Sequence, residues 1–416
     1  MEYPGRIGLI LLPQVSIGEL DVSCLGYGCY GVGGAYGAKD PSVWEGLIRQ
    51  AFDLGITLFD VAEAYGPAEE ILGRAVAPFR DQVVIASKVG VGPSGERDAS
   101  RGRVLEACQA SLRRLGADRI DLYQIHFDDP KTPIAETVGA LEELRTQGKI
   151  REYGVGHLPF ERVKEYCEIG RTAGVLFELS AVARASTRDI LPFLGQRAAA
   201  GKGPVGLAFS PTGRGLLTGA IGPDTEFDQG DIRSLDWLFR GAKRASGLRV
   251  RDRLAEIGAR LGKTPAQVAI AWVLAQPGVR VALTGPSRAE HLEENVGAVG
   301  WEFPGPELSD LEAFLTAEDQ RIRAESLVAA EDIMARPLQQ EADGAYQDLI
   351  FAMETAVELG KVAEADVIGL ITTMVKIRRE TGGRYDPRLE ELREELRRLV
   401  GGAARVRLEP SQAGGV

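Results

Sequence analysis

Three short apolar segments of the sequence each end in an ionisable side chain. Asp60 ends the segment Thr-Leu-Phe-Asp, Lys88 ends Ile-Ala-Ser-Lys, His126 ends Tyr-Gln-Ile-His, and Tyr65 follows Asp60 by five residues. In parallel α/β folds the carboxyl ends of the strands open onto one rim, so residues that are distant in sequence can converge there. The sequence therefore predicts one site that contains Asp60, Tyr65, Lys88 and His126.

These four residue types suit the reduction of a carbonyl group, which needs a hydride donor and a proton donor for the developing alkoxide. A Tyr hydroxyl is a poor acid at neutral pH, and a nearby Lys ammonium would lower its pKa by stabilising the phenolate. Asp60 would hold Lys88 charged and in place, and a neutral His126 would orient the carbonyl. Because a single strand-end charge is more often a structural ion pair, the prediction depends on all four residues.

The sequence alternates between strand-like and helix-like segments from about Asp21 to Gly285. Several strand candidates are continuous apolar runs, as expected for parallel strands that are covered on both faces. The predicted strands are Val22–Gly28, Thr57–Asp60, Val83–Lys88, Asp121–His126, Glu152–Gly156, Val175–Leu179, Val205–Phe209 and Arg280–Leu283. The predicted helices include Val43–Leu54, Arg103–Leu115, Thr137–Thr146, Phe160–Thr172 and Thr264–Leu274. This alternation indicates either a closed barrel or a large doubly wound sheet.

Two segments fall outside the alternation. We expect Ile17–Ser23 to pair with Ile7–Leu12 as a hairpin that plugs one end of a barrel. We expect Gly213–Arg249 to be a long polar connection that carries Trp237, and long loops in compact domains tend to be functional.

After about Glu318 the sequence pattern is only helical. Apolar residues at helical spacing are Tyr346, Leu349, Ile350, Met353 and Val357, followed by Val367–Val375 and by Leu389, Leu392, Leu396 and Leu399. We expect residues 1–318 to form the α/β domain and residues 319–416 to form a helical extension with a disordered tail from Glu409. Short helices need a packing partner, which would be the barrel or a second copy in a homo-oligomer.

Composition and charge exclude several classes of protein. The chain is 44% hydrophobic and 26% charged, which is ordinary for a globular protein, and no apolar run reaches membrane-spanning length. The net charge is −11 and no segment is dense in Lys and Arg, which argues against nucleic-acid binding. The four cysteines (Cys24, Cys29, Cys108 and Cys167) show no CxxC or metal spacing, as expected of reduced thiols in the cytoplasm.

The motifs around the four residues resemble the aldo-keto reductase family. FDVAEAYG (59–66) is similar to the family's signature around its catalytic Asp and Tyr, ASK (86–88) to its Lys strand, and DLYQIH (121–126) to its His strand. The resemblance covers about residues 15–318, in order and with family-like spacing. It implies a (β/α)8 TIM barrel in which Tyr65 is the general acid, Lys88 and Asp60 tune it, and His126 orients the carbonyl.

The same resemblance implies a nicotinamide cofactor. FSPTGRGLLTG (209–219) is similar to the family's pyrophosphate loop, and GPSR (285–288), followed by Glu294 and Asn295, is similar to its adenosine-phosphate site. Phe209 would stack on the nicotinamide, and Arg288 would lie near the 2′-phosphate of NADP(H). The implied cofactor contacts are Gly156, His157, Phe209, Ser210, Thr212, Gly213, Arg214, Gly285, Ser287, Arg288, His291, Glu294 and Asn295.

The sequence departs from the family pattern where the nicotinamide carboxamide would bind. The family's Ser-Asn pair after the fifth strand is Gly156 and His157 here, and its Gln in the sixth strand aligns with Phe177, or with Glu178 if the register shifts by one. His157 is then either a substitute for the missing Asn or a solvated loop residue.

Other candidate residues have more than one interpretation. Gly26 to Gly31 matches GxGxxG, but no helix follows directly, so we interpret it as a loop after the first strand. Tyr30 in this loop is a wall of the substrate pocket or part of a plain turn, and His291 is a phosphate contact or a surface residue. Phe127 and Trp237 are further candidates for the substrate pocket. Trp237 either lines the pocket or anchors its loop as a buried residue.

Three carboxylates near the four residues are not assigned chemistry. Glu63 lies between Asp60 and Tyr65, and we expect it to be solvated. Two Asp residues follow closely after His126, but no second His lies nearby, so we expect no metal site.

We therefore expect a cytoplasmic oxidoreductase that reduces an aldehyde or ketone to an alcohol with NAD(P)H, with a preference for NADPH. Its partner would be a small carbonyl substrate, without nucleic acid or membrane. The departures at the carboxamide site leave a non-redox lyase or epimerase on the same barrel as one alternative. The other is a regulatory protein that keeps the cofactor and acts through its C-terminal helices.

Overall fold

A computed structural model describes residues 12–37, 39–91, 96–201, 203–228, 230–234, 236–340, 344–358, 361–362 and 364–406. The chain forms two compact units, Met1–Asp231 with Gly247–Glu312 and Ile232–Ser246 with Ala313–Val416. The second unit thus includes Ile232–Ser246, a segment that the sequence analysis places in the barrel domain. The tail from Glu409 lies outside the described residues.

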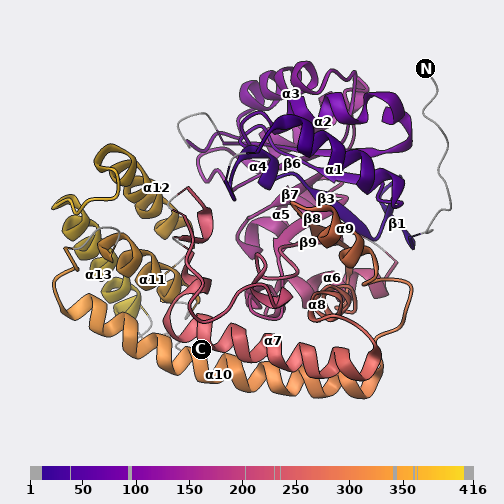
Figure 1. The fold of residues 1–416 in the computed structure, drawn as a ribbon. Helices are drawn as coiled ribbons and strands as arrows, with labels where there is room; N and C mark the ends of the chain where they lie inside the picture. Colours follow the sequence, from indigo (N-terminus) through magenta and orange to yellow (C-terminus); the bar gives the residue numbers. More distant parts are fainter. Residues whose placement is uncertain are drawn as a thin grey trace, which may run out of the picture. The chain divides into compact units, whose positions relative to one another are not determined.

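The first unit contains a closed barrel of eight parallel strands in the order β10-β3-β4-β5-β6-β7-β8-β9, surrounded by helices (Figure 1). The strands are β3 (Leu25–Gly28), β4 (Leu58–Asp60), β5 (Val84–Val89), β6 (Ile120–Ile125), β7 (Ile150–Gly156), β8 (Gly174–Glu178), β9 (Val205–Phe209) and β10 (Val279–Thr284). All eight predicted strands are confirmed to within a few residues, and the doubly wound sheet is excluded because β10 pairs with both β9 and β3.

A hairpin of β1 (Gln14–Ile17) and β2 (Leu20–Ser23) precedes the barrel. The predicted position was wrong, because the segment expected to be one strand, Ile17–Ser23, contains the turn itself, with Gly18 at φ +57°. Most of the expected partner, Ile7–Leu12, lies outside the described residues. The expected plug is confirmed, since hairpin side chains share one buried cluster with interior residues of the barrel, including Ile17, Leu20, Val22, Leu58, Val84, Leu122, Leu207 and Val281.

The helices of this unit begin and end at local signals in the sequence. Asp40 caps α1 by accepting from the Ser42 N–H, and Thr264 and Gln267 form a capping box on α8. Gly116, at φ +59°, ends α3. The helices are α1 (Pro41–Asp53), α2 (Ala68–Val76), α3 (Arg101–Leu115), α4 (Ile134–Thr146), α5 (Phe160–Ile169), α6 (Ile190–Ala199), α7 (Gly241–Leu261), α8 (Pro265–Leu274) and α9 (Ala289–Val296).

The expectation that Gly213–Arg249 is entirely an irregular connection was wrong at its end, because α7 starts at Gly241 and belongs in part to each unit. Short 3-10 turns occupy part of the connection: η4 (Leu216–Thr218), η5 (Ile232–Ser234) and η6 (Trp237–Phe239). Three others lie earlier in the chain: η1 (Gly31–Gly33), η2 (Ala77–Gln82) and η3 (Ala185–Thr187).

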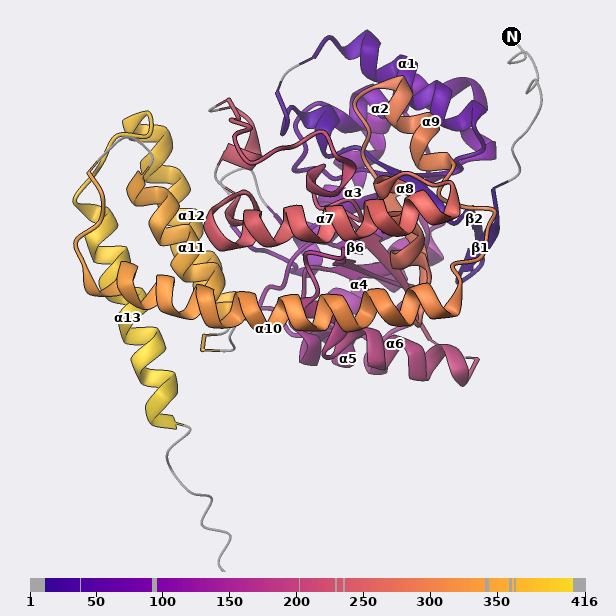
Figure 2. The ribbon, with the colours of Figure 1, turned by 60° about the horizontal axis from the view of Figure 1, so that its bottom comes forward.

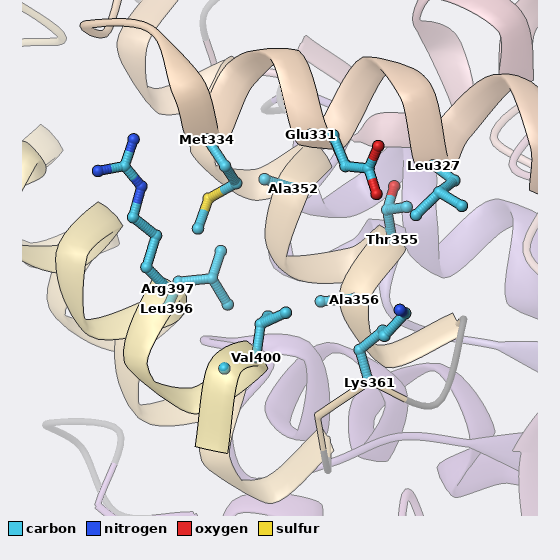
Figure 3. A pocket seen from close by; sticks show the side chains of 12 residues that line it. Leu327, Glu331, Met334, Ala352, Thr355, Ala356, Lys361, Leu396, Arg397 and Val400 are labelled. Carbon is cyan, nitrogen blue, oxygen red and sulfur yellow. The ribbon is translucent and has the colours of Figure 1, made fainter. Parts of the chain in front are cut away.

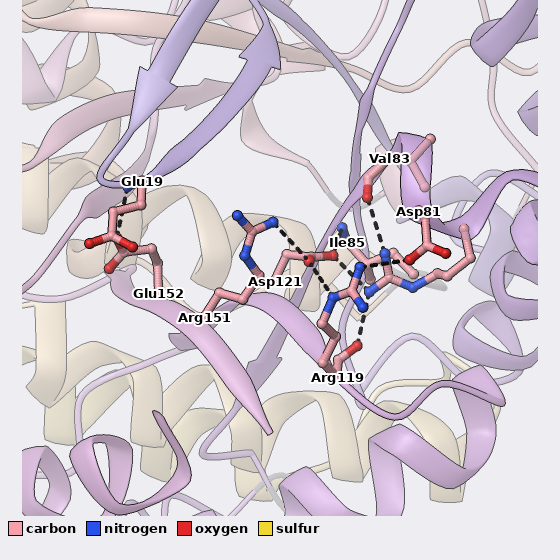
Figure 4. A network of polar contacts seen from close by, with 9 residues as sticks. Glu19, Asp81, Val83, Ile85, Arg119, Asp121, Arg151 and Glu152 are labelled. Carbon is pink, nitrogen blue, oxygen red and sulfur yellow. Dashed lines mark hydrogen bonds and ion pairs between the residues drawn. The ribbon is translucent and has the colours of Figure 1, made fainter. Parts of the chain in front are cut away.

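A network of charged residues ties the strands together at their amino ends (Figure 4). The buried Asp121 carboxylate accepts from the Ile85 N–H at 2.9 Å and from Arg80 at 2.7 Å, and Arg119 and Arg151 also contact it. On a neighbouring strand, Glu152 accepts from the Glu19 N–H of the hairpin at 2.8 Å. These ion pairs lie at the end of the barrel that serves stability in this fold.

The second unit consists mainly of helices (Figure 2). It contains most of α10 (Gly305–Ala335), together with α11 (Gly344–Glu358), α12 (Glu364–Thr381) and α13 (Arg388–Val406). The predicted helical extension is confirmed: Tyr346, Leu349, Met353, Leu389 and Leu396 are fully buried in a core of its own. Its self-association stays a prediction. Among the described residues, none of the helices is long and apolar enough to cross a membrane.

Candidate active site

The barrel brings the four predicted residues to the carboxyl ends of three adjacent strands. Asp60 is the last residue of β4, Lys88 lies one residue before the end of β5, and His126 directly follows β6. Tyr65 lies in the loop between β4 and α2. Parallel pairing of β4 with β5 and of β5 with β6 fixes their relative heights, with Asp60 opposite Ala86 and Lys88 opposite Gln124.

Lys88 is fully buried, and its ammonium group is held by two oxygen atoms. Its Nζ lies 2.5 Å from Oδ1 of Asp60 and donates to the carbonyl oxygen of Val61 at 2.9 Å. Gln124 donates to the other Asp60 oxygen at 3.5 Å. Burial raises the pKa of Asp60, and the Lys88 charge opposes that shift. The Lys88 ammonium also lies 4.9 Å from the centre of the Tyr65 ring.

The net shift in the pKa of Tyr65 is opposite in direction to the one expected from a nearby Lys88. Burial raises the pKa of Tyr65 well above its ordinary value, and the negative charge of Asp60 adds to the shift. The physical reason is desolvation: the buried phenol would lose hydration on ionising, and this effect outweighs any stabilisation of the phenolate by Lys88. At neutral pH Tyr65 is therefore a protonated phenol, which is the form that can donate a proton.

A cluster of aromatic rings surrounds His126 and includes His157. His126 lies 5.6 Å from Tyr65 and 4.5 Å from Phe127, measured between ring centroids, and His157 lies 4.7 Å from Phe127 and 4.8 Å from Phe209. Burial first, and then the charge of Lys88, lower the pKa of His126 well below 6.5, and they lower that of His157 to about 3. Both imidazoles are neutral at pH 7, as expected for His126, and His157 is half-buried against the rings of Phe127 and Phe209.

The sixth barrel strand directs Glu178, rather than Phe177, towards the rim. Leu176 belongs to the interior cluster of the barrel, and side chains alternate along a strand, so Phe177 faces outward and Glu178 inward. Of the two residues that could correspond to the family's Gln, this orientation favours Glu178 over Phe177. The Glu178 carboxylate forms an ion pair at 2.9 Å with Arg214. At the preceding strand end, a Cβ on Gly156 would lie 3.3 Å from Leu176.

The loop after β9 fits a phosphate group. Ser210, Gly213, Arg214 and Gly215 all have positive φ angles, between +52° and +94°. Ser210 and Arg214 are not glycine, and strained backbone of this kind is typical of ligand-binding loops. Consecutive left-handed residues can turn backbone N–H groups towards an anion. Within the same loop, the Thr212 backbone carbonyl accepts a hydrogen bond from the Leu217 N–H.

The loop after β10 adjoins this loop, because β10 pairs with β9 through Leu283 and Phe209. It contains Gly285 and Ser287, and the buried Thr284 hydroxyl just before it has no hydrogen-bond partner among the described residues. Arg288 is exposed at the start of α9, a position that favours anions. The two loops offer backbone N–H groups and the Arg288 guanidinium, which are groups of the kind that would hold the phosphates of a dinucleotide.

The remaining cofactor candidates lie on α9, and their surroundings differ from one residue to the next. His291 is exposed, Asn295 is buried, and the Glu294 backbone carbonyl accepts from Gln267 at 2.9 Å. Lys39 was missed by the sequence analysis, although its ammonium lies 2.5 Å from the Ser287 carbonyl oxygen, beside Arg288. Lys39 is a single Lys in a glycine-rich loop, and no sequence pattern indicates that it lies near Ser287.

The predicted pocket residues differ in their surroundings. The Tyr30 ring lies 5.1 Å from that of Tyr65, and the guanidinium of Arg97, also missed, lies 3.7 Å from the centre of the Phe127 ring. The backbone of Trp237 belongs to η6 in the second unit, and its side chain lies outside the described residues.

The expectation for Glu63 was wrong, because its side chain is mostly buried and pairs with Arg103 at 2.7 Å. GxGxxG is not a dinucleotide motif here, since Gly26 and Gly28 lie within β3 and the next α-helix starts at Pro41. Among the described residues, there is no group of three or more His, Cys, Asp or Glu that could hold a metal ion.

Residues 24–316 match the model of the Aldo/keto reductase family. The chain is 33% identical over 307 residues to aldo-keto reductase YhdN of Bacillus subtilis, covering 71% of this chain and 91% of that protein. It is 34% identical over 296 residues to aldo-keto reductase str7 of Strobilurus tenacellus, covering 69% of this chain and 87% of that protein.

Solved structures agree with these matches. The glycerol dehydrogenase AKR11B4 of Gluconobacter oxydans superposes with a TM-score of 0.67 at 31% identity, covering 73% of this chain and 95% of that one. The aldo-keto reductase AKR11C1 of Bacillus halodurans superposes with a TM-score of 0.61 at 26% identity, covering 73% and 96%. With its eight-stranded barrel and its matching residues 24–316, the chain belongs to the aldo-keto reductase family of carbonyl-reducing oxidoreductases.

Proposed function

We propose that the protein reduces an aldehyde or ketone to an alcohol with NADPH, and that Tyr65 donates the proton. The observation that carries this proposal is the placement of a protonated Tyr65 between the Lys88–Asp60 ion pair and a neutral His126 at the barrel rim. NADPH, when bound, supplies the hydride that reaches the carbonyl carbon. The cytoplasm as its location is supported by four cysteines that are all free thiols.

Each residue at the rim has a separate task in this proposal. Neutral His126 donates a hydrogen bond that orients the carbonyl oxygen towards Tyr65, and its buried Nδ1 has no partner among the described residues. Tyr65 transfers its proton to that oxygen as the C–H bond forms. Lys88 and Asp60 are positioning residues, because they act through Tyr65 and touch no substrate atom in this account.

A redox-neutral reaction on the same barrel is the second candidate function. Gly156 and His157 replace the family's Ser and Asn, and Glu178 forms an ion pair with Arg214. The groups that would bind the nicotinamide carboxamide therefore differ from those of the family pattern. Acid–base chemistry by Tyr65 and His126 alone could catalyse an elimination or an epimerisation. The two candidates differ in whether the wild-type enzyme oxidises NADPH when a carbonyl compound is added.

Tyr65→Phe should lower the rate of NADPH oxidation by about 10²–10⁴-fold with an accepted aldehyde, because it removes the general acid. Cofactor affinity should be retained, since the proposed phosphate contacts lie in other loops. Tyr123→Phe is the matched control: that buried hydroxyl has no partner among the described residues, so its loss should leave the rate unchanged. Single-turnover hydride transfer by Tyr65→Phe at the wild-type rate would disprove the assignment.

The pH dependence of hydride transfer tests the protonation state of His126. Because its pKa lies well below 6.5, the imidazole stays neutral at pH 6.5 and above, and the rate should show no inflection near the ordinary His value. Stopped-flow measurement of NADPH oxidation at saturating substrate gives this profile. A rate that rises on acidification with a midpoint near 6.5 would instead identify an imidazolium as the active form.

Arg288→Ala should weaken NADPH binding about tenfold to a hundredfold and leave NADH binding nearly unchanged. A charge-assisted guanidinium–phosphate contact contributes on the order of 1.5–3 kcal/mol. Arg280→Ala is the control, because Arg280 is also exposed but lies near the amino end of β10. Fluorescence titration with both cofactors measures the effect, and equal losses for NADPH and NADH would rule out phosphate recognition by Arg288.

A further inference from the structure

The C-terminal helical unit contains a partly open cavity of about 280 Å³ between α10, α11 and α13 (Figure 3). Small side chains create the space, with Ala330 on α10, Ala352 and Ala356 on α11, and Gly401 on α13. Larger apolar side chains complete the wall, namely Leu327, Met334, Leu396 and Val400. An engineered apolar cavity of about 150 Å³ binds benzene, so this one has room for a ring with a short substituent.

Thr355 is a buried polar group in this apolar wall. Its side chain is fully buried, and its hydroxyl has no hydrogen-bond partner among the described residues. In Figure 3 the hydroxyl lies on the side of the cavity formed by α10, near Leu327 and Glu331. A helical Thr usually donates to the carbonyl four residues earlier, but no such bond forms here. An unpartnered buried hydroxyl costs about 1–3 kcal/mol, so a ligand oxygen that bonds to it would recover that loss.

Charged side chains line the cavity as well, but they are not deeply buried. Glu331 and Lys361 are exposed, and the partly buried Arg397 pairs with Glu394 on the same helix at 2.5 Å. A ligand carboxylate or ammonium placed next to Thr355 would lose its hydration and meet a neutral hydroxyl. The deep end of the cavity therefore suits a neutral oxygen.

We propose that this cavity binds a compact, neutral, largely apolar molecule with one hydroxyl or carbonyl oxygen, which hydrogen-bonds to Thr355. The apolar body lies against the alanines and leucines of the three helices. The proposal depends only on residues of the helical unit and does not require the barrel to be a reductase.

Methyl NMR of the full-length protein labelled at methionine tests the site. Met334 lines the cavity, whereas Met353 and Met374 lie in the core of the same unit without lining it. Benzyl alcohol should shift the Met334 methyl signal in a saturable way and leave that of Met374 nearly unchanged. Met334 belongs to the helical unit and lines this cavity, so its signal reports binding at this site. If no probe shifts Met334, the cavity is a packing defect and the proposal is wrong.

Two isosteric comparisons test the role of Thr355. Ethylbenzene matches benzyl alcohol in shape but lacks the hydroxyl, and Thr355→Val matches Thr in shape but lacks the hydrogen-bonding group. Thr355→Val should weaken benzyl alcohol relative to ethylbenzene by about threefold to tenfold, and it should raise the melting temperature of the unliganded protein. An unchanged ratio of the two dissociation constants would show that Thr355 does not recognise the ligand oxygen.

Two further experiments test the chemical class of the ligand and the volume of the cavity. Benzoate should bind more weakly than benzyl alcohol, and equal or tighter binding of benzoate would overturn the neutral class. Ala356→Leu should fill the cavity and abolish the Met334 shift with benzyl alcohol and with ethylbenzene. A shift that persists in a folded Ala356→Leu protein would place the probe outside the cavity.

Discussion

The buried ion pair of Lys88 and Asp60 is the interaction on which the site depends. An unpaired ammonium in the interior of a barrel would be strongly destabilising. Lys88 therefore requires both the Asp60 carboxylate at 2.5 Å and the Val61 carbonyl at 2.9 Å. Because these partners lie at and after the end of β4, they fix the chain that leads to Tyr65. A Cβ on Gly33 would lie 2.6 Å from the Tyr65 carbonyl oxygen, so that loop also packs closely on the backbone of Tyr65.

The barrel strands carry stabilising residues at their amino ends and the residues proposed for chemistry at their carboxyl ends. At its amino end β6 carries Asp121, which is bound by arginines, and His126 follows its carboxyl end. The hairpin plug and the Asp121 network close one end, which leaves the other free for exposed loops. The low dielectric that raises the pKa of Tyr65 also keeps His126 neutral, so the rim provides two neutral hydrogen-bond donors beside one balanced ion pair.

The sequence predicted the barrel strands and the convergence of four residues, because strand ends and residue types are local properties. It did not predict the direction of the Tyr65 pKa shift, which depends mainly on how far the phenol is buried. The inward direction of Glu178 and the proximity of Lys39 to Ser287 depend on strand register and on loop packing. The unpartnered Thr355 hydroxyl arises from the spacing of three helices, which no sequence pattern records.

The central claim is that Asp60 serves the reaction mainly by positioning Lys88, so that the two residues act as one unit, and a double-mutant cycle tests it most directly. Single-turnover NADPH oxidation with one aldehyde would be compared in wild type, Asp60→Asn, Lys88→Met and the double variant. We predict large losses in both single variants and a double variant no slower than Lys88→Met, because Asp60 has nothing left to position once Lys88 is gone. Losses that multiply in the double variant would show that the two residues act independently and would contradict this account.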